Sequence, residues 1–162
     1  MGIMANPTVV QGNAKPLFGG HIYEKTSATN EIVNKRLLAR GTASHQLKLC
    51  AAQGIPVAIG VSQLRPGYDS NNNIDSDYAV DGKMITNAAL APDILVRGTL
   101  AASQTIVEGD KLASDDNGLL KKWASSGDVS VAIAEESKTT GAGETAEILI
   151  RPLQPGTNET HA

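Results

Sequence analysis

The residues best suited to binding an ion form a polar run in the middle of the chain. Carboxylate and amide oxygens alternate there, at Asp69, Asn71, Asn73, Asp75 and Asp77. Calcium takes about six to eight oxygen ligands, so this composition is one that a calcium loop could have. An EF-hand loop beginning at Asp69 would need glycine and glutamate where the sequence has Ile74 and Val80. We therefore expect a solvated loop and no metal site.

Other groups that could do chemistry are isolated from one another. His21, His45 and His161 have neither zinc-ligand spacing nor a partner that would mark a general base. Cys50, the one cysteine, stands between apolar neighbours, which predicts a buried and unreactive thiol. Gly19-Gly20 lacks the second glycine of a phosphate loop, because Glu24 takes that place. We predict that the protein is not an enzyme and has no cofactor.

Composition narrows the possible partners. The chain of 162 residues has a net charge of −3, and its basic residues are not clustered, so we expect no nucleic-acid partner. No apolar run approaches the roughly 20 residues that a membrane span needs. The N-terminus is too polar for a signal peptide, so we expect a protein made in the host cytoplasm with no membrane partner. The sole tryptophan, Trp123, is expected in core or inter-subunit packing rather than as a sugar-binding platform.

An internal repeat organises the chain. Without a gap, residues 31–63 align with 105–137 at an offset of 74, and Val57-Ala58-Ile59 then matches Val131-Ala132-Ile133. Residues 93–97 match 147–151 at an offset of 54, which leaves about 20 extra residues in the first copy. That insertion falls within 64–90 and is predicted to be a surface loop.

Short runs rich in Val and Ile, separated by Gly, Asp and Asn, predict strands. We expect them at 35–40, 46–51, 56–62, 94–99, 110–114, 118–123, 129–135 and 145–151. Asp116-Asn117-Gly118 has the composition of a tight hairpin turn, and Asn87 to Ala91 is expected to form a helical turn at most. Arg97 and Arg151 end the matched strands, where each could pair with an acid of the other copy or remain a surface charge.

These elements predict an all-β fold, a compact barrel or sandwich built from two repeated modules, 31–97 and 105–151. The modules form one β-domain over 29–153. Residues 1–28, which hold Pro and Gly without periodicity, are expected to be an extended arm, and 154–162 a flexible tail. Pseudo-twofold symmetry is the expected relation between the modules.

The second copy resembles a known family. Val107-Glu108-Gly109-Asp110-Lys111-Leu112, the Asp116-Asn117-Gly118 turn, Val131-Ala132-Ile133-Ala134 and a closing Ile148-Leu149-Ile150 before Arg151-Pro152 are similar to the head decoration, or capsid cement, proteins of tailed bacteriophages. The resemblance covers roughly residues 31–153 and implies a β-tulip or β-clip-like barrel. Ser130 stands where the family has glycine, and the 64–90 loop has no counterpart.

That resemblance implies a virion protein on the outer surface of the capsid. Its partner would be the major capsid protein, whose lattice it would stabilise, often as a homotrimer. The contacts with capsid or neighbouring subunits would come from the arm and the loop, with Pro7, Val9, Val10, Pro16, Leu17, Phe18, Tyr68 and Tyr78 as candidates. The alternative is a β-barrel receptor- or glycan-binding module of a virion appendage, with the 64–90 loop recognising the ligand.

Overall fold

Nearly all of the regular secondary structure in the described chain is β-strand. The computed structural model describes residues 9–12, 32–33, 35–42, 47–60, 78–79, 87–90, 92, 94–154 and 156–162. Within these ranges one short 3-10 turn, Asp116–Gly118, accompanies fourteen strands. The predicted all-β class is therefore confirmed.

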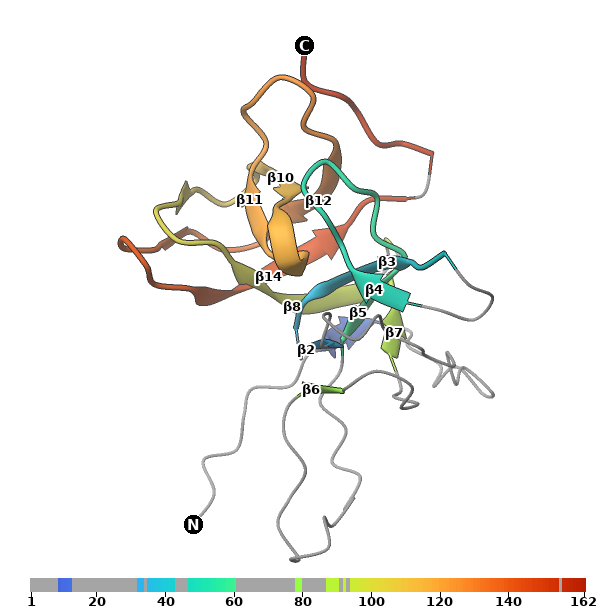
Figure 1. The fold of residues 1–162 in the computed structure, drawn as a ribbon. Helices are drawn as coiled ribbons and strands as arrows, with labels where there is room; N and C mark the ends of the chain where they lie inside the picture. Colours follow the sequence, from blue (N-terminus) through green and yellow to red (C-terminus); the bar gives the residue numbers. More distant parts are fainter. Residues whose placement is uncertain are drawn as a thin grey trace, which may run out of the picture.

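Five strands from the second half of the chain close into a barrel, and β1 from the N-terminal segment adds to the same six-stranded sheet (Figure 1). The strand order is β1-β8-β11-β10-β12-β14, and β14 also pairs with β8, which closes the ring. Pairing is antiparallel except between β11 and β8, where Leu120 faces Leu100. The strands are β1 (Val9–Gly12), β8 (Ile94–Leu100), β10 (Lys111–Ser114), β11 (Leu120–Lys122), β12 (Ser130–Ala134) and β14 (Ala146–Pro152).

Alternating side chains define the inside of this barrel. Along β8 every second residue from Ile94 to Leu100 is buried, and the residues between them are half-buried. Gly98 occupies one inward position because Leu120 fills the space, with its Cδ1 2.5 Å from where a Cβ would stand. This alternation is the two-residue period of a β-strand, and it directs every second side chain of β8 into the core.

A second sheet of four strands has the order β4-β3-β5-β7. Its strands are β3 (Leu37–Arg40), β4 (Leu47–Leu49), β5 (Ala58–Gly60) and β7 (Asn87–Ala89). Two further pairs complete the described fold: β2 (Ile32–Val33) with β6 (Tyr78–Ala79), and β9 (Thr105–Ile106) with β13 (Lys138–Thr139).

The two halves of the chain use the same strand order. In the first, β4-β3-β5-β7 follows the pattern of β11-β10-β12-β14 in the second. Leu37 faces Ile59 and Lys111 faces Ile133, so both members of the pair are displaced by the offset of 74. The matched segments 93–97 and 147–151 do not occupy equivalent places, because they belong to β8 and β14, which pair with each other. In the first half β7 lies beside β5, in the place that β14 takes beside β12 in the second half.

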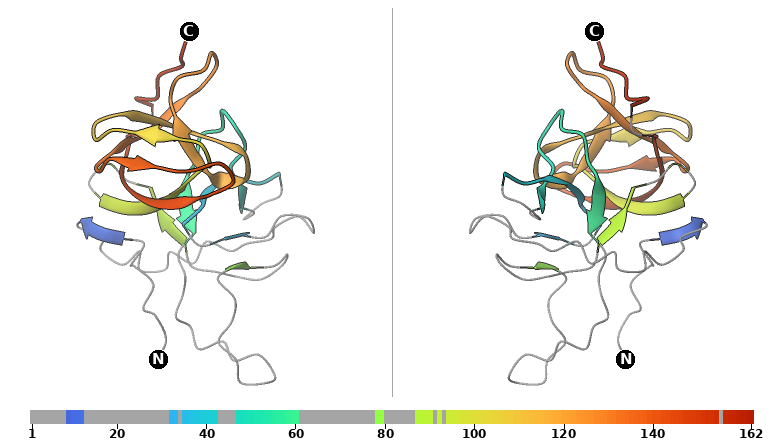
Figure 2. Two further views of the ribbon diagram at one scale, coloured as in Figure 1. Left: turned by 90° about the vertical axis from the view of Figure 1, so that its left-hand side faces the viewer. Right: turned by 90° about the vertical axis from the view of Figure 1, so that its right-hand side faces the viewer.

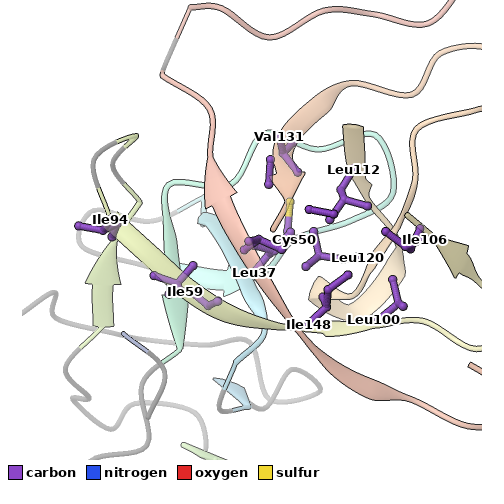
Figure 3. Packing of buried hydrophobic residues seen from close by; sticks show 14 residues of the cluster. Leu37, Cys50, Ile59, Ile94, Leu100, Ile106, Leu112, Leu120, Val131 and Ile148 are labelled. Atoms are coloured by element: carbon purple, nitrogen blue, oxygen red, sulfur yellow. The ribbon is translucent and has the colours of Figure 1, made fainter. Parts of the chain in front are cut away.

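One hydrophobic core joins both sheets (Figure 3). Leu37, Cys50 and Ile59 from the first half pack with the inward residues of the barrel, and Figure 3 shows Cys50 beside Leu37 and Leu120. A smaller cluster, made of Leu38, Leu47 and Ala58, lies apart from this core on strands β3 to β5. The shared core makes the described halves parts of one packed body.

The predicted hairpin turn at Asp116–Gly118 is confirmed. Asn117 and Gly118 have φ of 59° and 71°, and a pair of left-handed central residues is typical of a tight hairpin turn. The turn docks against the four-stranded sheet, because the Gly118 N–H donates to the Cys50 carbonyl at 2.8 Å and Arg36 donates to the Asn117 carbonyl at 3.1 Å. A hairpin of the barrel thus contacts the other half of the chain.

Two local predictions need correction. Asn87–Ala89 is a strand, β7, and not a helical turn, because pairing with β5 satisfies its backbone. The inserted segment 64–90 is not entirely a loop, since it contributes β6 and β7, while residues 64–77 and 80–86 lie outside the described residues.

Candidate interaction surface

The predicted contact residues fall on two different sheets. Val9 and Val10 belong to β1 on the edge of the six-stranded sheet, and Tyr78 belongs to β6, where it faces Val33. The other five predicted contacts lie outside the described residues: Pro7, Pro16, Leu17, Phe18 and Tyr68. The described pairings therefore bring Val9 and Val10 together and leave Tyr78 in a separate strand pair.

Strand β1 shows how part of the N-terminal segment binds the barrel. It pairs antiparallel with the beginning of β8, with Val9 facing Val96, Gln11 facing Leu95 and Gly12 facing Ile94. The register shifts between Val9 and Gln11, which makes Val10 the extra residue of a bulge. Figure 2 shows β1, in blue, alongside β8. Main-chain pairing at a sheet edge is thus built into the described structure.

The Val107–Asp110 segment, which carries part of the family resemblance, is a capped turn. Asp110 Oδ2 accepts the Val107 N–H at 2.9 Å and lies 2.8 Å from Lys122 Nζ. Gly109 has a φ of 89° and donates its N–H to the Ala134 carbonyl. The hydrogen bonds from Lys122 and Val107 lower the pKa of Asp110. These residues therefore shape the entry to β10.

Asp128 stabilises the segment that connects β11 to β12. Its carboxylate is fully buried, with Oδ1 2.8 Å from Lys121 Nζ and Oδ2 accepting the N–H groups of Ser125 at 2.9 Å and Ala124 at 3.3 Å. Burial acts to raise the pKa of Asp128, but the hydrogen bonds from Lys121 and the two backbone N–H groups outweigh it, and the pKa is lowered. The charged carboxylate of Asp128 therefore has a structural role, because it binds Lys121 and the turn that follows it.

Trp123 is engaged in contacts within the chain. Its Nε1–H donates to the Asp128 carbonyl at 2.9 Å, and Lys111 Nζ lies 4.9 Å from the ring centroid. The His161 ring meets the indole edge-on, with ring centroids 4.6 Å apart. These contacts use the half-buried indole in packing within the chain, in line with the predicted packing role.

The C-terminal segment is not the flexible tail that the sequence predicts. Ser130 exchanges hydrogen bonds with Glu159 and Asn158: the Ser130 N–H donates to the Glu159 carbonyl, and Asn158 Nδ2 donates to the Ser130 carbonyl. The Ser130 hydroxyl accepts the Glu159 N–H at 2.8 Å. Thr160 bridges to Val129, so residues 156–162 form a strap along the barrel. Sequence reasoning missed this strap because its partners are distant in the chain.

The two arginines that end the matched strands have different surroundings. Arg151 Nε lies 2.9 Å from Glu135 Oε1, so this arginine pairs with an acid of its own copy, and the hypothesis of pairing with the other copy is wrong for it. Arg97 Nε is buried without a hydrogen-bond partner among the described residues. Between the halves, Lys35 forms an ion pair with Glu147, and Thr99 donates to the Lys35 carbonyl at 3.1 Å.

The remaining candidates for chemistry give no reactive constellation in the part of the chain that is described. Cys50 is buried, as predicted, and burial raises the pKa of its thiol. No group of three or more His, Cys, Asp and Glu residues in the described ranges could hold a metal ion. His21, His45 and the 69–77 run lie outside these ranges. None of the helices described is long and apolar enough for a membrane span.

Comparisons with known proteins return little. No family model matches the chain, and no curated protein matches it. Among solved structures, the chain is similar to one described as "The crystal structure of head fiber gp8.5 N base in bacteriophage phi29". The TM-score is 0.47 at 16% sequence identity, with 81% of this chain and 94% of that chain covered.

Proposed function

We propose that this chain is a structural protein of a tailed-phage virion that binds the outer surface of the capsid and stabilises the lattice of the major capsid protein. The observation that carries the proposal is where the family-like segments lie. Val107–Leu112, the Asp116–Gly118 turn, β12 and β14 belong to the same closed barrel, each at a turn or strand that closes it. The resemblance therefore follows one structural unit rather than scattered matches.

The barrel suits a cement protein physically. Closure leaves its strands paired on both sides, which gives a rigid body with few edges open to uncontrolled association. Strand β1 pairs by main-chain hydrogen bonds, and β-addition of this kind lets a terminal segment bind a partner's sheet edge. The arm 1–28 and the loop 64–90 are the proposed contact segments.

A homotrimer is the proposed form on the capsid. Three copies that each contact a capsid subunit would gain from effective concentration, so each single contact could be weak. Occupancy of the lattice could then be high without a large individual interface.

The experiment is co-sedimentation of the purified full chain with expanded heads that lack it, followed by imaging of the pelleted particles. Saturable binding at regular lattice positions is expected. Leu17→Ala/Phe18→Ala, in the arm, should weaken binding by about tenfold or more if these are anchor residues. Val107→Ala is the matched control, since Val107 is 55% exposed and belongs to neither the arm 1–28 nor the loop 64–90.

Two outcomes would contradict the proposal. A complete lack of binding to heads of the phage that encodes the chain would favour a ligand-binding module, tested next on a glycan array. Equal loss of binding in the arm variant and the Val107→Ala control would remove the arm from the contact surface.

A further inference from the structure

Strand β8 has three neighbours in the described structure. It pairs with β14 along Val96–Leu100, with β11 at Leu100, and with β1 along Ile94–Val96. The first two pairings close the barrel, whereas β1 only adds to the sheet edge. The ring would therefore remain closed if a different strand occupied the β1 position.

Strand β1 is held at that position by one short strand pair. Three residue pairs connect it to β8, and the bulge at Val10 interrupts them. Among the described strands β1 pairs with no other, so it is bound on one side only. Such a strand can leave and return without unfolding the barrel.

The chain between β1 and β2 is long enough to reach another copy. Residues 13–31 would span about 60 Å if extended at roughly 3.3 Å per residue. A compact protein of 162 residues has a radius of gyration of about 15 Å by the usual scaling. The connection between Gly12 and Ile32 therefore does not force β1 onto its own β8.

We propose that the Ile94–Val96 edge of β8 is an acceptor site for β1 of a second copy of this chain. Exchange forms the same main-chain hydrogen bonds as the intrachain pairing, so the enthalpy of the strand pair is retained. If each copy donates β1 to the next around a ring, every acceptor edge is filled and no edge is left open. The exchange links neighbouring copies to each other and does not depend on their binding to a capsid.

Cysteine pairing between isotopically distinct full-length chains tests the exchange. Gln11 and Leu95 face each other, and facing residues of antiparallel strands lie about 4.5–5.5 Å apart at Cα, within the range of a disulfide. A ¹⁵N-labelled Gln11→Cys chain is unfolded and refolded with an unlabelled Leu95→Cys chain, concentrated and oxidised. Mass spectrometry of linked peptides is expected to give the 11–95 link between labelled and unlabelled chains.

Two controls set the background. Thr99→Cys replaces Leu95→Cys in one, because Thr99 is also a half-buried residue of β8 but lies beyond the β1 pairing, and it should give no link. The unmodified chain is the other, since its buried Cys50 should not cross-link.

The proposal is overturned if the mixed single variants give no interchain link while one chain carrying both substitutions gives only an intrachain link. A measurement without substitutions decides the case if the variants fail to fold. In a mixture of ¹³C-labelled and unlabelled wild-type chains, isotope-filtered NOEs between the backbone protons of Gln11 and Leu95 should appear for exchange and be absent for intrachain pairing.

Discussion

Asp128 is the residue whose ionisation most directly supports the barrel. The carboxylate is fully buried, and its partners are Lys121 and the N–H groups of the 124–128 turn. Because folding lowers the pKa of Asp128, its contribution to stability is present above the pKa of an unfolded aspartate, near about 3.9, and is lost as pH falls toward the lower folded value. The group thus links folding to acid pH.

Replacing this carboxylate should destabilise the protein at neutral pH. We expect Asp128→Asn to lower the free energy of unfolding by about 3 kcal/mol at pH 7, because it breaks a buried ion pair. The difference from wild type should shrink as pH falls below the pKa of an unfolded aspartate, near about 3.9, because protonation of Asp128 removes the charge that the variant lacks. Urea unfolding at each pH measures both effects.

Asp110→Asn is the comparison for that experiment. Asp110 also has a lowered pKa but is partly exposed, so we expect a loss of about 1 kcal/mol or less. An Asp128→Asn variant as stable as wild type at pH 7, or one with unchanged acid sensitivity, would refute the role assigned to Asp128.

The hairpin turn between β10 and β11 joins the two halves of the fold, and Gly118 makes this contact possible. A Cβ at this position would overlap the Leu37 carbonyl oxygen and stand 3.1 Å from Arg36 Cβ, and the φ of 71° disfavours any other residue. We expect Gly118→Ala to cost about 3 kcal/mol, from backbone strain together with the displaced contact. Thermal and urea unfolding provide the measurement.

Gly143→Ala separates those two causes. Gly143 has a φ of 74°, but no atom lies within 4 Å of the place where a Cβ would stand, so only the backbone cost of about 1 kcal/mol should remain. If both variants lose the same stability, the close approach of the turn to β3 contributes nothing.

The strands of the fold could be predicted from local patterns, since a short run rich in Val and Ile between Gly, Asp and Asn is a property of each strand by itself. Leu37–Arg40, Lys111–Ser114 and Ser130–Ala134 lie inside three of the predicted ranges. The prediction for Asn87–Ala89 is wrong because its small residues have little strand propensity, and pairing with β5 decides its conformation. Tertiary context overrides propensity in such short segments.

The strap and the buried charge could not be predicted in the same way. Asn158 and Glu159 bind Ser130 across a long stretch of chain, and a polar C-terminal sequence gives no sign of its partner. Asp128 stands in a turn-like context, where a solvent-exposed aspartate has the same sequence pattern. Among the predicted contact residues, the pairing of β1 with β8 was likewise beyond the reach of pattern reasoning.

The shared core implies that the described halves unfold together. Ile59 from the four-stranded sheet is fully buried in the same cluster as the barrel residues Leu112 and Ile148. Two repeats with similar strand order could in principle fold as separate units, but neither half of this core would be shielded from water without the other. We therefore expect the two halves to unfold together in one cooperative transition.

Ile59→Ala tests this coupling, with Trp123, the sole tryptophan, as a reporter in the barrel. The substitution should lower the free energy of unfolding by about 2–5 kcal/mol, because it leaves a cavity in the common core. Indole fluorescence and far-UV circular dichroism should then show the same lowered midpoint. Ile55→Ala, at a position 55% exposed in the same half, should change stability by less than about 0.5 kcal/mol. Fluorescence that keeps the wild-type midpoint while the dichroism midpoint falls would mean that the barrel remains folded without the four-stranded sheet.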